Sequence, residues 1–240
     1  MRVLILGYGK MGKTIEQIAL NRNHSVPYKI DLNNKHELSS VSDKEVDVAI
    51  EFSNPESAYE NVKFCIENNI PVVCGTTGWL DKKKEIEALC LKKGGGFFYA
   101  SNYSVGVNLF FHFNKKLAQI MNGYPQYQVS MEEIHHTEKK DAPSGTAITL
   151  AEGILSAYPV KKNWVNEETK KREELSIISK RIDKVPGTHT IFYQSEVDTI
   201  ELRHTAHSRQ GFAEGAVIAA EWLVGKKGVF GMDDMLKINL

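Results

Sequence analysis

The feature of this sequence that most constrains its fold is the join between its first apolar run and a glycine motif. Residues 2–6 read RVLIL, a run typical of a strand that is buried on both faces of a parallel sheet. GYGKMG follows in the pattern G-x-G-x-x-G, and apolar side chains then recur at helical spacing. Gly7 permits a tight turn, Gly9 lets the backbone approach a pyrophosphate, and Gly12 allows close packing of helix and sheet. We therefore predict a strand, a phosphate-binding turn and a helix at the start of the chain.

The alternation of short apolar runs with helical patterns continues over the first hundred residues, which predicts a doubly wound parallel sheet. Beyond about Ser101 the runs are longer and alternate apolar with polar residues, as in a sheet with one solvated face. FAEGAVIAAEWLVGKKGVFGMDDML, near the end, again predicts a helix with a glycine stop. We expect an α/β protein: a Rossmann dinucleotide-binding domain with a parallel sheet, from residues 1–101 and 214–240, and an α+β domain with a mixed or antiparallel sheet, from residues 102–213.

Charge balance and cysteine content argue against several classes of protein. The 30 basic and 30 acidic residues cancel, so no overall field draws nucleic acid or an anionic membrane. The 3 cysteines lack C-x-x-C pairing, which favours free thiols in a reducing cytosol. The first apolar run is too short for a signal sequence or a membrane span. We expect a cytoplasmic protein that binds neither nucleic acid nor membrane.

Further features near the glycine motif favour a dinucleotide. Asp31 ends the second predicted strand, 19 residues after Gly12, where a carboxylate can accept hydrogen bonds from ribose hydroxyls. Its charge disfavours a 2′-phosphate, although Lys35 is close enough in sequence to blunt that preference. Asp31 as a simple turn residue stays open. The loops CGTTGW and ASNYSVG follow later parallel strands, whose carboxyl ends are where ligands bind in such sheets.

The segment EEIHHTEKKDAPSGTA is the second centre of chemistry. A strand ending at His135 and His136 sends these side chains to opposite sides, and Lys139 follows within reach. The small residues at 144–146 then open a helix, whose N-terminus attracts a carboxylate. A dianionic small molecule is the ligand that these groups favour. We expect no metal, because adjacent histidines rarely bind one ion and the lysine repels cations; a capped helix beside structural histidines is the plainer alternative.

The same segment resembles the signature of the dihydrodipicolinate reductase (4-hydroxy-tetrahydrodipicolinate reductase) family, E-x-H-H-x-x-K-x-D-A-P-S-G-T-A, without a gap from Glu133 to Ala147. The resemblance extends along nearly the whole chain, through GYGKMGK, FSNPES, GTTGW, SNYSVGVNLF and IELRHTAHSRQGFAEGAVIAAEWL. The glycine loop departs from the family pattern, because it is one residue shorter than usual and carries Lys10 where arginine is common.

The resemblance implies NAD(P)H-dependent reduction of 4-hydroxy-tetrahydrodipicolinate to tetrahydrodipicolinate with loss of water, in diaminopimelate and lysine synthesis. It implies that His135 and Lys139 are catalytic and that the 102–213 domain binds substrate and forms a homotetramer. Substrate would be bound by His136, Ser144, Gly145 and Thr146. NADH or NADPH would be bound by Gly7, Gly9, Lys10, Met11, Gly12, Asp31, Gly75, Thr76, Thr77, Ala100, Ser101, Asn102 and Tyr103. The alternatives are another two-domain NAD(P)H oxidoreductase acting on a small dicarboxylate and a non-catalytic NADH-sensing protein.

Overall fold

The structure, a computed structural model, describes residues 1–208 and 210–237. The chain divides into two compact units. Of the described residues, the first unit contains Met1–Val105 and 210–237, and the second contains 106–208. Each unit has its own sheet and its own core, so each is described by itself.

The first unit is built on a six-stranded sheet in the order β11-β5-β4-β3-β1-β2, and every strand pair in it is parallel. The strands are β1 (Arg2–Leu6), β2 (Ser25–Ile30), β3 (Val48–Glu51), β4 (Val72–Cys74), β5 (Gly96–Tyr99) and β11 (Gly228–Phe230). β3 and β4 are buried at every position and β1 at all but its first, because helices cover both faces of the sheet. The prediction of a doubly wound parallel sheet is confirmed.

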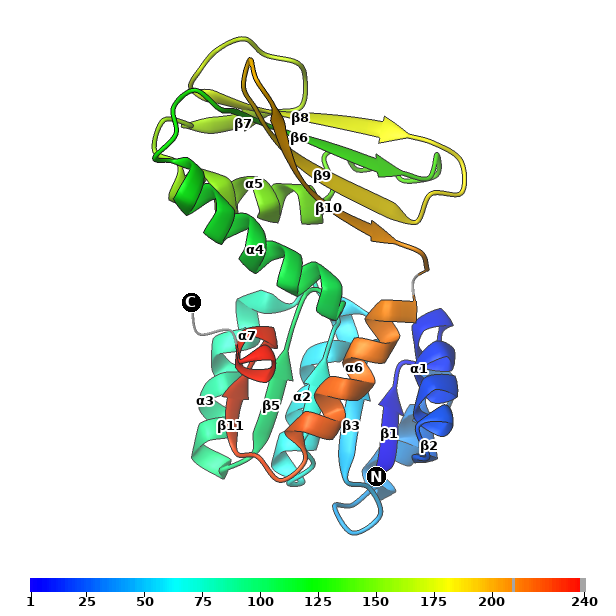
Figure 1. Cartoon of the computed structure of the whole chain (residues 1–240). Helices are drawn as coiled ribbons and strands as arrows, with labels where there is room; N and C mark the ends of the chain where they lie inside the picture. The colour runs from blue at the N-terminus through cyan, green and yellow to red at the C-terminus, as the bar shows by residue number, and fades with distance from the viewer. Residues whose placement is uncertain (209, 238–240) are drawn as a thin grey trace. The chain divides into compact units, whose positions relative to one another are not determined.

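Helices pack on both faces of this sheet (Figure 1). α1 (Lys10–Asn21) and α6 (Gln210–Leu223) share one apolar core with it, and α2 (Pro55–Glu67) and α3 (Lys83–Lys93) share the other. The remaining helices of this unit are η1 (Leu32–Ser40), η2 (Leu80–Lys82) and α7 (Met232–Leu236). The strand order reverses between β1 and β3, and in open α/β sheets the carboxyl ends of strands at such a point form the ligand crevice.

The second unit contains a five-stranded mixed sheet in the order β10-β9-β6-β8-β7. Its strands are β6 (Gln128–His135), β7 (Asn163–Val165), β8 (Glu174–Arg181), β9 (Gly187–Gln194) and β10 (Thr199–Ala206). β10, β9 and β6 pair antiparallel, whereas β6, β8 and β7 pair parallel. The helices α4 (Val105–Met121) and α5 (Gly145–Ala157) cover one face of this sheet (Figure 1) and share a core with it.

Four elements were not predicted from the sequence: the helix α4, the short helices η1 and η2, and the short strand β7. The strand β11 and the helix α7 lie in the segment that was predicted as the end of one helix, which instead ends at Leu223. The signal for α4 was present, since its buried residues Val107, Phe110, Asn114, Ala118 and Met121 recur every three or four positions. The strands β7 and β11 have 3 residues each, too few for a period to be recognised.

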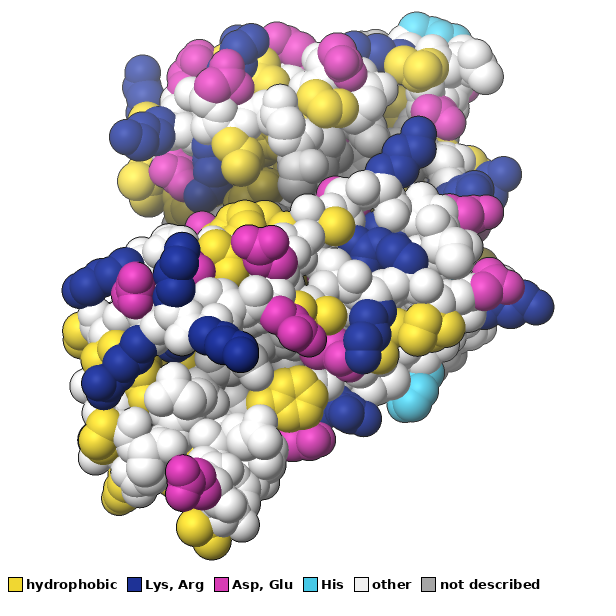
Figure 2. Space-filling model, turned by 90° about the horizontal axis from the view of Figure 1, so that it is seen from above, with side chains coloured by type: hydrophobic (Ala, Val, Ile, Leu, Met, Phe, Trp, Pro, Cys, Tyr) yellow, Lys and Arg dark blue, Asp and Glu magenta, His cyan; other side chains and the backbone are white. Residues whose placement is uncertain are grey.

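The surface carries mixed charge. Basic and acidic side chains are interspersed on the face drawn in Figure 2, in keeping with the equal numbers of both kinds in the chain. Among the residues that the structure describes, no helix has the length and apolar character needed to cross a bilayer.

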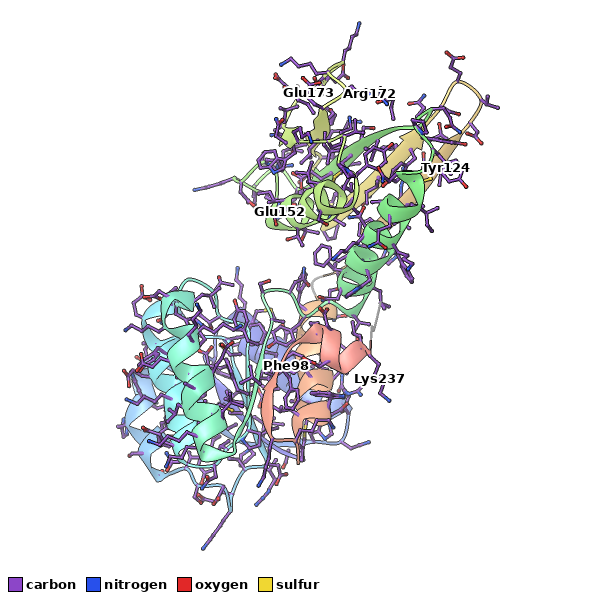
Figure 3. All side chains as sticks on the ribbon, turned by 90° about the vertical axis from the view of Figure 1, so that its left-hand side faces the viewer. Phe98, Tyr124, Glu152, Arg172, Glu173 and Lys237 are labelled. Atoms are coloured by element: carbon purple, nitrogen blue, oxygen red, sulfur yellow. The ribbon has the colours of Figure 1, made fainter. Side chains whose placement is uncertain are left out.

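Aromatic packing joins β5 to α6 and to the loop after β5. Phe98 lies inside the first unit (Figure 3), with its ring 6.0 Å from that of Trp222 and 5.8 Å from that of Tyr103. Gly215 of α6 lies directly on the Tyr103 backbone, because a Cβ atom at residue 215 would be 1.8 Å from the Tyr103 carbonyl oxygen. A side chain at position 215 would therefore force α6 away from the sheet.

We expect Gly215→Ala to destabilise the first unit by about 1–3 kcal/mol or more, the usual cost of overpacking. The sign of the change in the free energy of unfolding is informative, because replacing glycine with alanine inside a helix otherwise stabilises a protein by about 1 kcal/mol. Thermal unfolding of Gly215→Ala and of Gly95→Ala measures the effect, since a Cβ atom at Gly95 meets only ordinary contacts of 3.7 Å and longer. Equal melting temperatures for both variants would contradict the close approach of α6 to Tyr103.

Candidate active site

The glycine turn after β1 has the backbone that its motif predicts. Gly7 has a φ of +90°, and a Cβ atom there would lie 2.2 Å from the Phe52 carbonyl oxygen. A Cβ atom at Gly12 would lie 2.2 Å from the carbonyl oxygen of Gly7. Gly9, the N-cap of α1, faces open space, and the first turn of α1 contains no acidic residue. The turn therefore presents bare backbone N–H groups and the positive end of a helix, which together fit a phosphate.

A cavity of about 170 Å³ opens beside this turn. It is lined by Gly7, Gly9, Ile30, Asp31, Leu32, Lys35, Phe52, Ser53, Asn54, Ser57 and Asn61. Asp31 has a structural role as well, because its Oδ1 accepts a hydrogen bond of 2.9 Å from the Leu32 N–H and caps η1. Asp31 thus both caps a helix and lines the cavity, and Lys35 lines the same cavity.

The other two loops at the carboxyl edge of the sheet are anchored by side chains that the sequence marked as candidates. Thr76 is buried, and its hydroxyl accepts a hydrogen bond of 2.9 Å from the Ser53 N–H. The Tyr103 side chain is buried, and its hydroxyl donates to the Cys74 carbonyl oxygen at 2.7 Å. Thr77 and Ser101 are exposed. Thr76 and Tyr103 therefore position these loops, whereas the groups that can meet a ligand are exposed side chains and backbone.

Glu51, at the end of β3, was missed by the sequence analysis. Its carboxylate is fully buried and accepts hydrogen bonds from the Ser53 N–H at 3.1 Å and from the Cys74 thiol at 3.1 Å. Burial raises the pKa of Cys74 well above its ordinary value, and the nearby charge of Glu51 adds to that effect. Cys74 is thus an inert buried thiol, and Glu51 joins the loop after β3 to the loop after β4.

In the second unit, β6 and α5 position the candidate residues of the HHxxK segment. His135 is the last residue of β6 and is buried, whereas His136 beyond it is half-buried. Ser144 caps α5 by accepting a hydrogen bond from the Ala147 N–H at 3.2 Å. Gly145 and Thr146 form the first turn of α5, where N–H groups have no partner within the helix. Ser144 therefore caps this N-terminus, and the N–H groups of Gly145 and Thr146 are the ones that a ligand could reach.

Lys139 lies in the loop between β6 and α5. Its ammonium contacts both oxygens of Asp141, at 2.7 and 2.8 Å, and its side chain is 21% exposed. The hydrogen bond from Lys139 lowers the pKa of Asp141. The ammonium therefore reaches solvent while a carboxylate of the same loop holds it.

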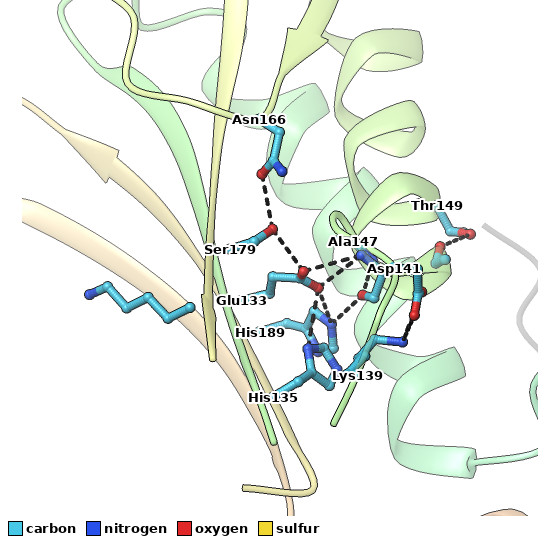
Figure 4. Close-up of polar contacts among 12 residues, drawn as sticks. Glu133, His135, Lys139, Asp141, Ala147, Thr149, Asn166, Ser179 and His189 are labelled. Carbon is cyan, nitrogen blue, oxygen red and sulfur yellow. Dashed lines mark hydrogen bonds and ion pairs between the residues drawn. The ribbon is translucent and has the colours of Figure 1, made fainter. Parts of the chain in front are cut away.

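A polar cluster behind this loop, which we call the Glu133 cluster, contains Glu133, His135, Ser179 and His189 (Figure 4), together with Arg181. The register of the strands brings its members together: Glu133 of β6 pairs with Ser179 of β8 and with His189 of β9, and His135 pairs with Arg181. The Glu133 side chain has no exposed surface. Of these five residues the sequence analysis found only His135, although Glu133 is two positions away on the same face of β6.

The two oxygens of the Glu133 carboxylate have different neighbours. Oε1 accepts hydrogen bonds from the Ser179 hydroxyl at 2.8 Å and from Nη2 of Arg181 at 3.3 Å. The Ser144 N–H donates to both oxygens, at 3.2 and 3.1 Å. Oε2 also faces Nδ1 of His135 at 3.4 Å and Nε2 of His189 at 3.6 Å. One carboxylate therefore contacts the histidines and the N-terminus of α5.

Arg181 holds the loop that carries Lys139. Its Nη2 donates to the Asp141 carbonyl oxygen at 2.6 Å, and its Nε donates to the Lys139 carbonyl oxygen at 3.3 Å. The same guanidinium contacts Glu133. The charge pair of Arg181 and Glu133 thus connects the loop to the sheet.

Burial and charge shift the two central pKa values of this cluster. Burial alone raises the pKa of Glu133, but hydrogen bonds from His189, Ser144 and Ser179 outweigh it, and the net pKa lies well below the usual range. Burial lowers the pKa of His135 to about 4, although the charge of Glu133 opposes that shift. At neutral pH the carboxylate is therefore ionised and the His135 imidazole is neutral.

Glu133, His135 and His189 place three ligand atoms within 4.8 Å of one another, close enough to hold a metal ion. The sequence argument against metal considered only the adjacent pair His135 and His136, whereas the structure pairs His135 with His189. The Arg181 guanidinium, 3.3 Å from the same carboxylate, opposes a second cation at this position.

The first unit combines a doubly wound sheet with a glycine turn, and the second brings together a lysine, histidines and a helix N-terminus. These features together are typical of a two-domain oxidoreductase of the dinucleotide-binding class. Residues 1–103 match the family "Dihydrodipicolinate reductase, N-terminus", and residues 106–236 match "Dihydrodipicolinate reductase, C-terminus". The chain belongs to the dihydrodipicolinate reductase family and is an oxidoreductase.

Individual relatives agree with this assignment. The chain is 50% identical over 236 residues to the 4-hydroxy-tetrahydrodipicolinate reductase of Christiangramia forsetii, with 98% of each chain covered. A protein of the same name from Methanoregula boonei is 33% identical over 254 residues, which cover 99% of this chain and 98% of the relative. Among solved structures, the dipicolinate-bound dihydrodipicolinate reductase of Paenisporosarcina sp. TG-14 is similar, with a TM-score of 0.77, 25% identity and 98% of each chain covered.

The lowered pKa of His135 predicts how the stability of the second unit depends on pH. The neutral ring contributes stability that is fully present above the ordinary histidine pKa of 6.5. This stability is lost as the pH falls toward about 4, because the unfolded chain then binds a proton that the folded unit does not bind. The loss for one such histidine is about 3 kcal/mol at most.

Unfolding of wild type and of His135→Asn between pH 4 and 7 measures this effect. Wild type is expected to lose more stability than the variant over that range. Glu133 of β6, Arg181 of β8, His189 of β9 and Lys139 of the loop face position 135 and are present in both proteins, so the two proteins differ only in the imidazole. Parallel stability curves would refute the assignment of a neutral buried imidazole to His135.

Proposed function

We propose that this chain reduces 4-hydroxy-tetrahydrodipicolinate to tetrahydrodipicolinate with NADH or NADPH, in diaminopimelate and lysine synthesis. In the balanced reaction, one substrate, one NAD(P)H and one proton give tetrahydrodipicolinate, NAD(P)⁺ and one water. The observation that carries the proposal is the folded form of Glu133–Ala147, in which Lys139 and the N-terminus of α5 belong to one loop held by Arg181. The names of the relatives support the same reaction.

The cofactor half of the proposal rests on the first unit. The glycine turn and the N-terminus of α1 would hold the pyrophosphate, and Asp31 and Lys35 would meet the ribose. The residues proposed to contact the cofactor are those predicted from the sequence: Gly7, Gly9, Lys10, Met11, Gly12, Asp31, Gly75, Thr76, Thr77, Ala100, Ser101, Asn102 and Tyr103. When bound, the reduced nicotinamide supplies the hydride.

The substrate half rests on charge complementarity in the second unit. The substrate is a ring with two carboxylates, and the N–H groups of Gly145 and Thr146 at the N-terminus of α5 are suited to bind one of them. Lys139 and His136 would meet the dianion from the loop. Ser144 has its hydroxyl engaged as the helix cap, so it would act by holding the turn in place.

Lys139 and His135 would divide the proton chemistry between them. Loss of water from the substrate gives a conjugated ring, and addition of hydride at C4 leaves electron density toward the ring nitrogen. Lys139 carries the charge that an acid needs, so we assign proton donation to it. His135, neutral because burial lowers its pKa to about 4, would orient the donor or the ring as a hydrogen-bond acceptor.

We further propose that residues 1–101 with 214–240 bind the dinucleotide, that residues 102–213 bind substrate, and that the enzyme is a cytoplasmic homotetramer. Support for assembly comes from the face of the second sheet that α4 and α5 leave uncovered. Ile178 and Phe192 of that face are only half-buried, and they line a hollow there. A second copy of the sheet would bury these side chains.

The direct test is the loss of NADH absorbance with enzymatically generated 4-hydroxy-tetrahydrodipicolinate. We expect turnover by wild type and a kcat lower by about 10²–10⁴-fold in Lys139→Ala, because the variant lacks the acid. Lys140→Ala is the matched control: the same charge is removed from the exposed neighbouring position. NADH affinity should be unchanged in both variants.

The outcomes separate the alternatives. Turnover of unrelated imines or sugar lactones in place of this substrate would indicate another oxidoreductase. Tight NADH binding without turnover of any of these compounds would indicate an NADH-sensing protein. Equal kcat values for Lys139→Ala and Lys140→Ala would remove Lys139 from the mechanism.

Asp31→Asn tests the choice of cofactor. Asparagine keeps an oxygen that can cap η1 but removes the charge that repels a 2′-phosphate. We expect KM for NADPH to fall relative to KM for NADH, and Asp31→Ala to add a loss of stability because the cap is gone. The same ratio of Michaelis constants in wild type and Asp31→Asn would show that Asp31 serves only as a cap.

A further inference from the structure

The position of Glu133 suggests a role that the reaction itself does not assign. On one side of the carboxylate Ser179 and Arg181 donate to Oε1, on the other two imidazoles face Oε2, and the Ser144 N–H donates to both oxygens. Its side chain is fully buried, so bulk solvent does not reach these contacts. The fold therefore determines which hydrogen bonds the Glu133 carboxylate accepts from its neighbours.

An ionised carboxylate can only accept hydrogen bonds, so a ring nitrogen that faces it is favoured in its protonated form. Nδ1 of His135 is such a nitrogen: it is buried, lies 3.4 Å from Oε2 of Glu133, and has no hydrogen-bond partner among the residues that the structure describes. Hydrogen bonds of catalytic groups are often long in ligand-free structures. This placement favours the proton of the neutral His135 ring on Nδ1, which leaves the lone pair on Nε2.

The other edge of the His135 ring lies against Gly187. A Cβ atom at Gly187 would be 3.1 Å from Nε2 of His135, which is tighter than ordinary contact. Glycine at this position of β9 leaves Nε2 the space that a side chain would occupy. The His135 ring thus has Glu133 on one edge, where the carboxylate can accept a hydrogen bond from Nδ1–H. It has Gly187 on the other edge, where the missing side chain leaves space beside Nε2.

We propose that Glu133 is a positioning residue, whose carboxylate holds His135 in the Nδ1–H tautomer and, through the Ser144 N–H, holds the N-terminus of α5 in the same arrangement. The effect of this positioning on catalysis rests on the proposed function. In that function Nε2 of His135 accepts a hydrogen bond and α5 binds a substrate carboxylate. Glu133 touches neither ligand in that scheme and acts through its neighbours.

Glu133→Gln gives a prediction that a general loss of stability would not give. Glutamine has one carbonyl oxygen, and Ser179 and Arg181, which donate only to Oε1, require it there. The Ser144 N–H reaches both oxygens and can keep its hydrogen bond to the one that remains. The amide NH₂ then takes the place of Oε2 and donates toward Nδ1 of His135. A donor there favours a lone pair on Nδ1, so the proton of the His135 ring moves to Nε2.

The experiment is ¹⁵N NMR of histidine-labelled protein at neutral pH, with the His135 signals assigned by their loss in His135→Ala. We expect the Nδ1–H tautomer in wild type and the Nε2–H tautomer in Glu133→Gln. Glu132→Gln is the matched control, because it removes the same charge from the neighbouring residue of β6, which pairs with Lys180 on the opposite face. That control should keep the wild-type tautomer.

Kinetics supply the second readout. Glu133→Gln should lower kcat by about 10²-fold, the usual size of an orientation effect. In a His135→Ala background the further loss should be smaller than in wild type, because only the contact between Glu133 and the N-terminus of α5 remains to be disturbed. Glu132→Gln should leave kcat near wild type.

A Nδ1 without a proton in wild type overturns the inference, even where Glu133→Gln does not fold. The same tautomer in wild type and Glu133→Gln also overturns it. Failure of the proposed function is a different result: wild type would not turn over the substrate, while the NMR spectra would still report the tautomer.

Discussion

One buried carboxylate organises the second unit. Glu133 gathers hydrogen bonds from β8, β9 and the N-terminus of α5, and its charge is balanced by Arg181. Removal of one partner from a buried charge pair costs about 3–5 kcal/mol, because the remaining charge is left without compensation. The strand register, the helix cap and the loop that carries Lys139 therefore depend on each other through this group.

The first unit uses the same device with different chemistry. Glu51 lies buried at the end of β3, as Glu133 lies buried in β6. Glu51 accepts the N–H of Ser53, which lines the cavity beside the glycine turn, and Glu133 accepts the N–H of Ser144, which caps α5. Glu51 has thiol, hydroxyl and amide neighbours, whereas Glu133 has a guanidinium and two imidazoles. In both units a buried acid holds backbone at the edge of a proposed ligand site.

The charges around the substrate loop also explain why paired histidines and a lysine occur together. Burial keeps His135 neutral, so it does not repel the Lys139 ammonium. That ammonium is held by Asp141, a carboxylate on the same loop. A substrate carboxylate would compete with Asp141 for this ammonium.

The sequence alone determined the elements whose signal is local. The glycine motif predicted the turn after β1, because only glycine permits the positive φ and the two close backbone approaches found there. The hydrophobic periods predicted β6 and α5, and Ser144 marked the start of α5. It also located His135 and Lys139, because both lie in one uninterrupted motif. The tertiary structure alone decided that Glu133, Arg181 and His189 surround His135. Their meeting depends on the register between β6, β8 and β9, and a period of two along each strand shows which face a side chain takes but not which residue of another strand lies beside it.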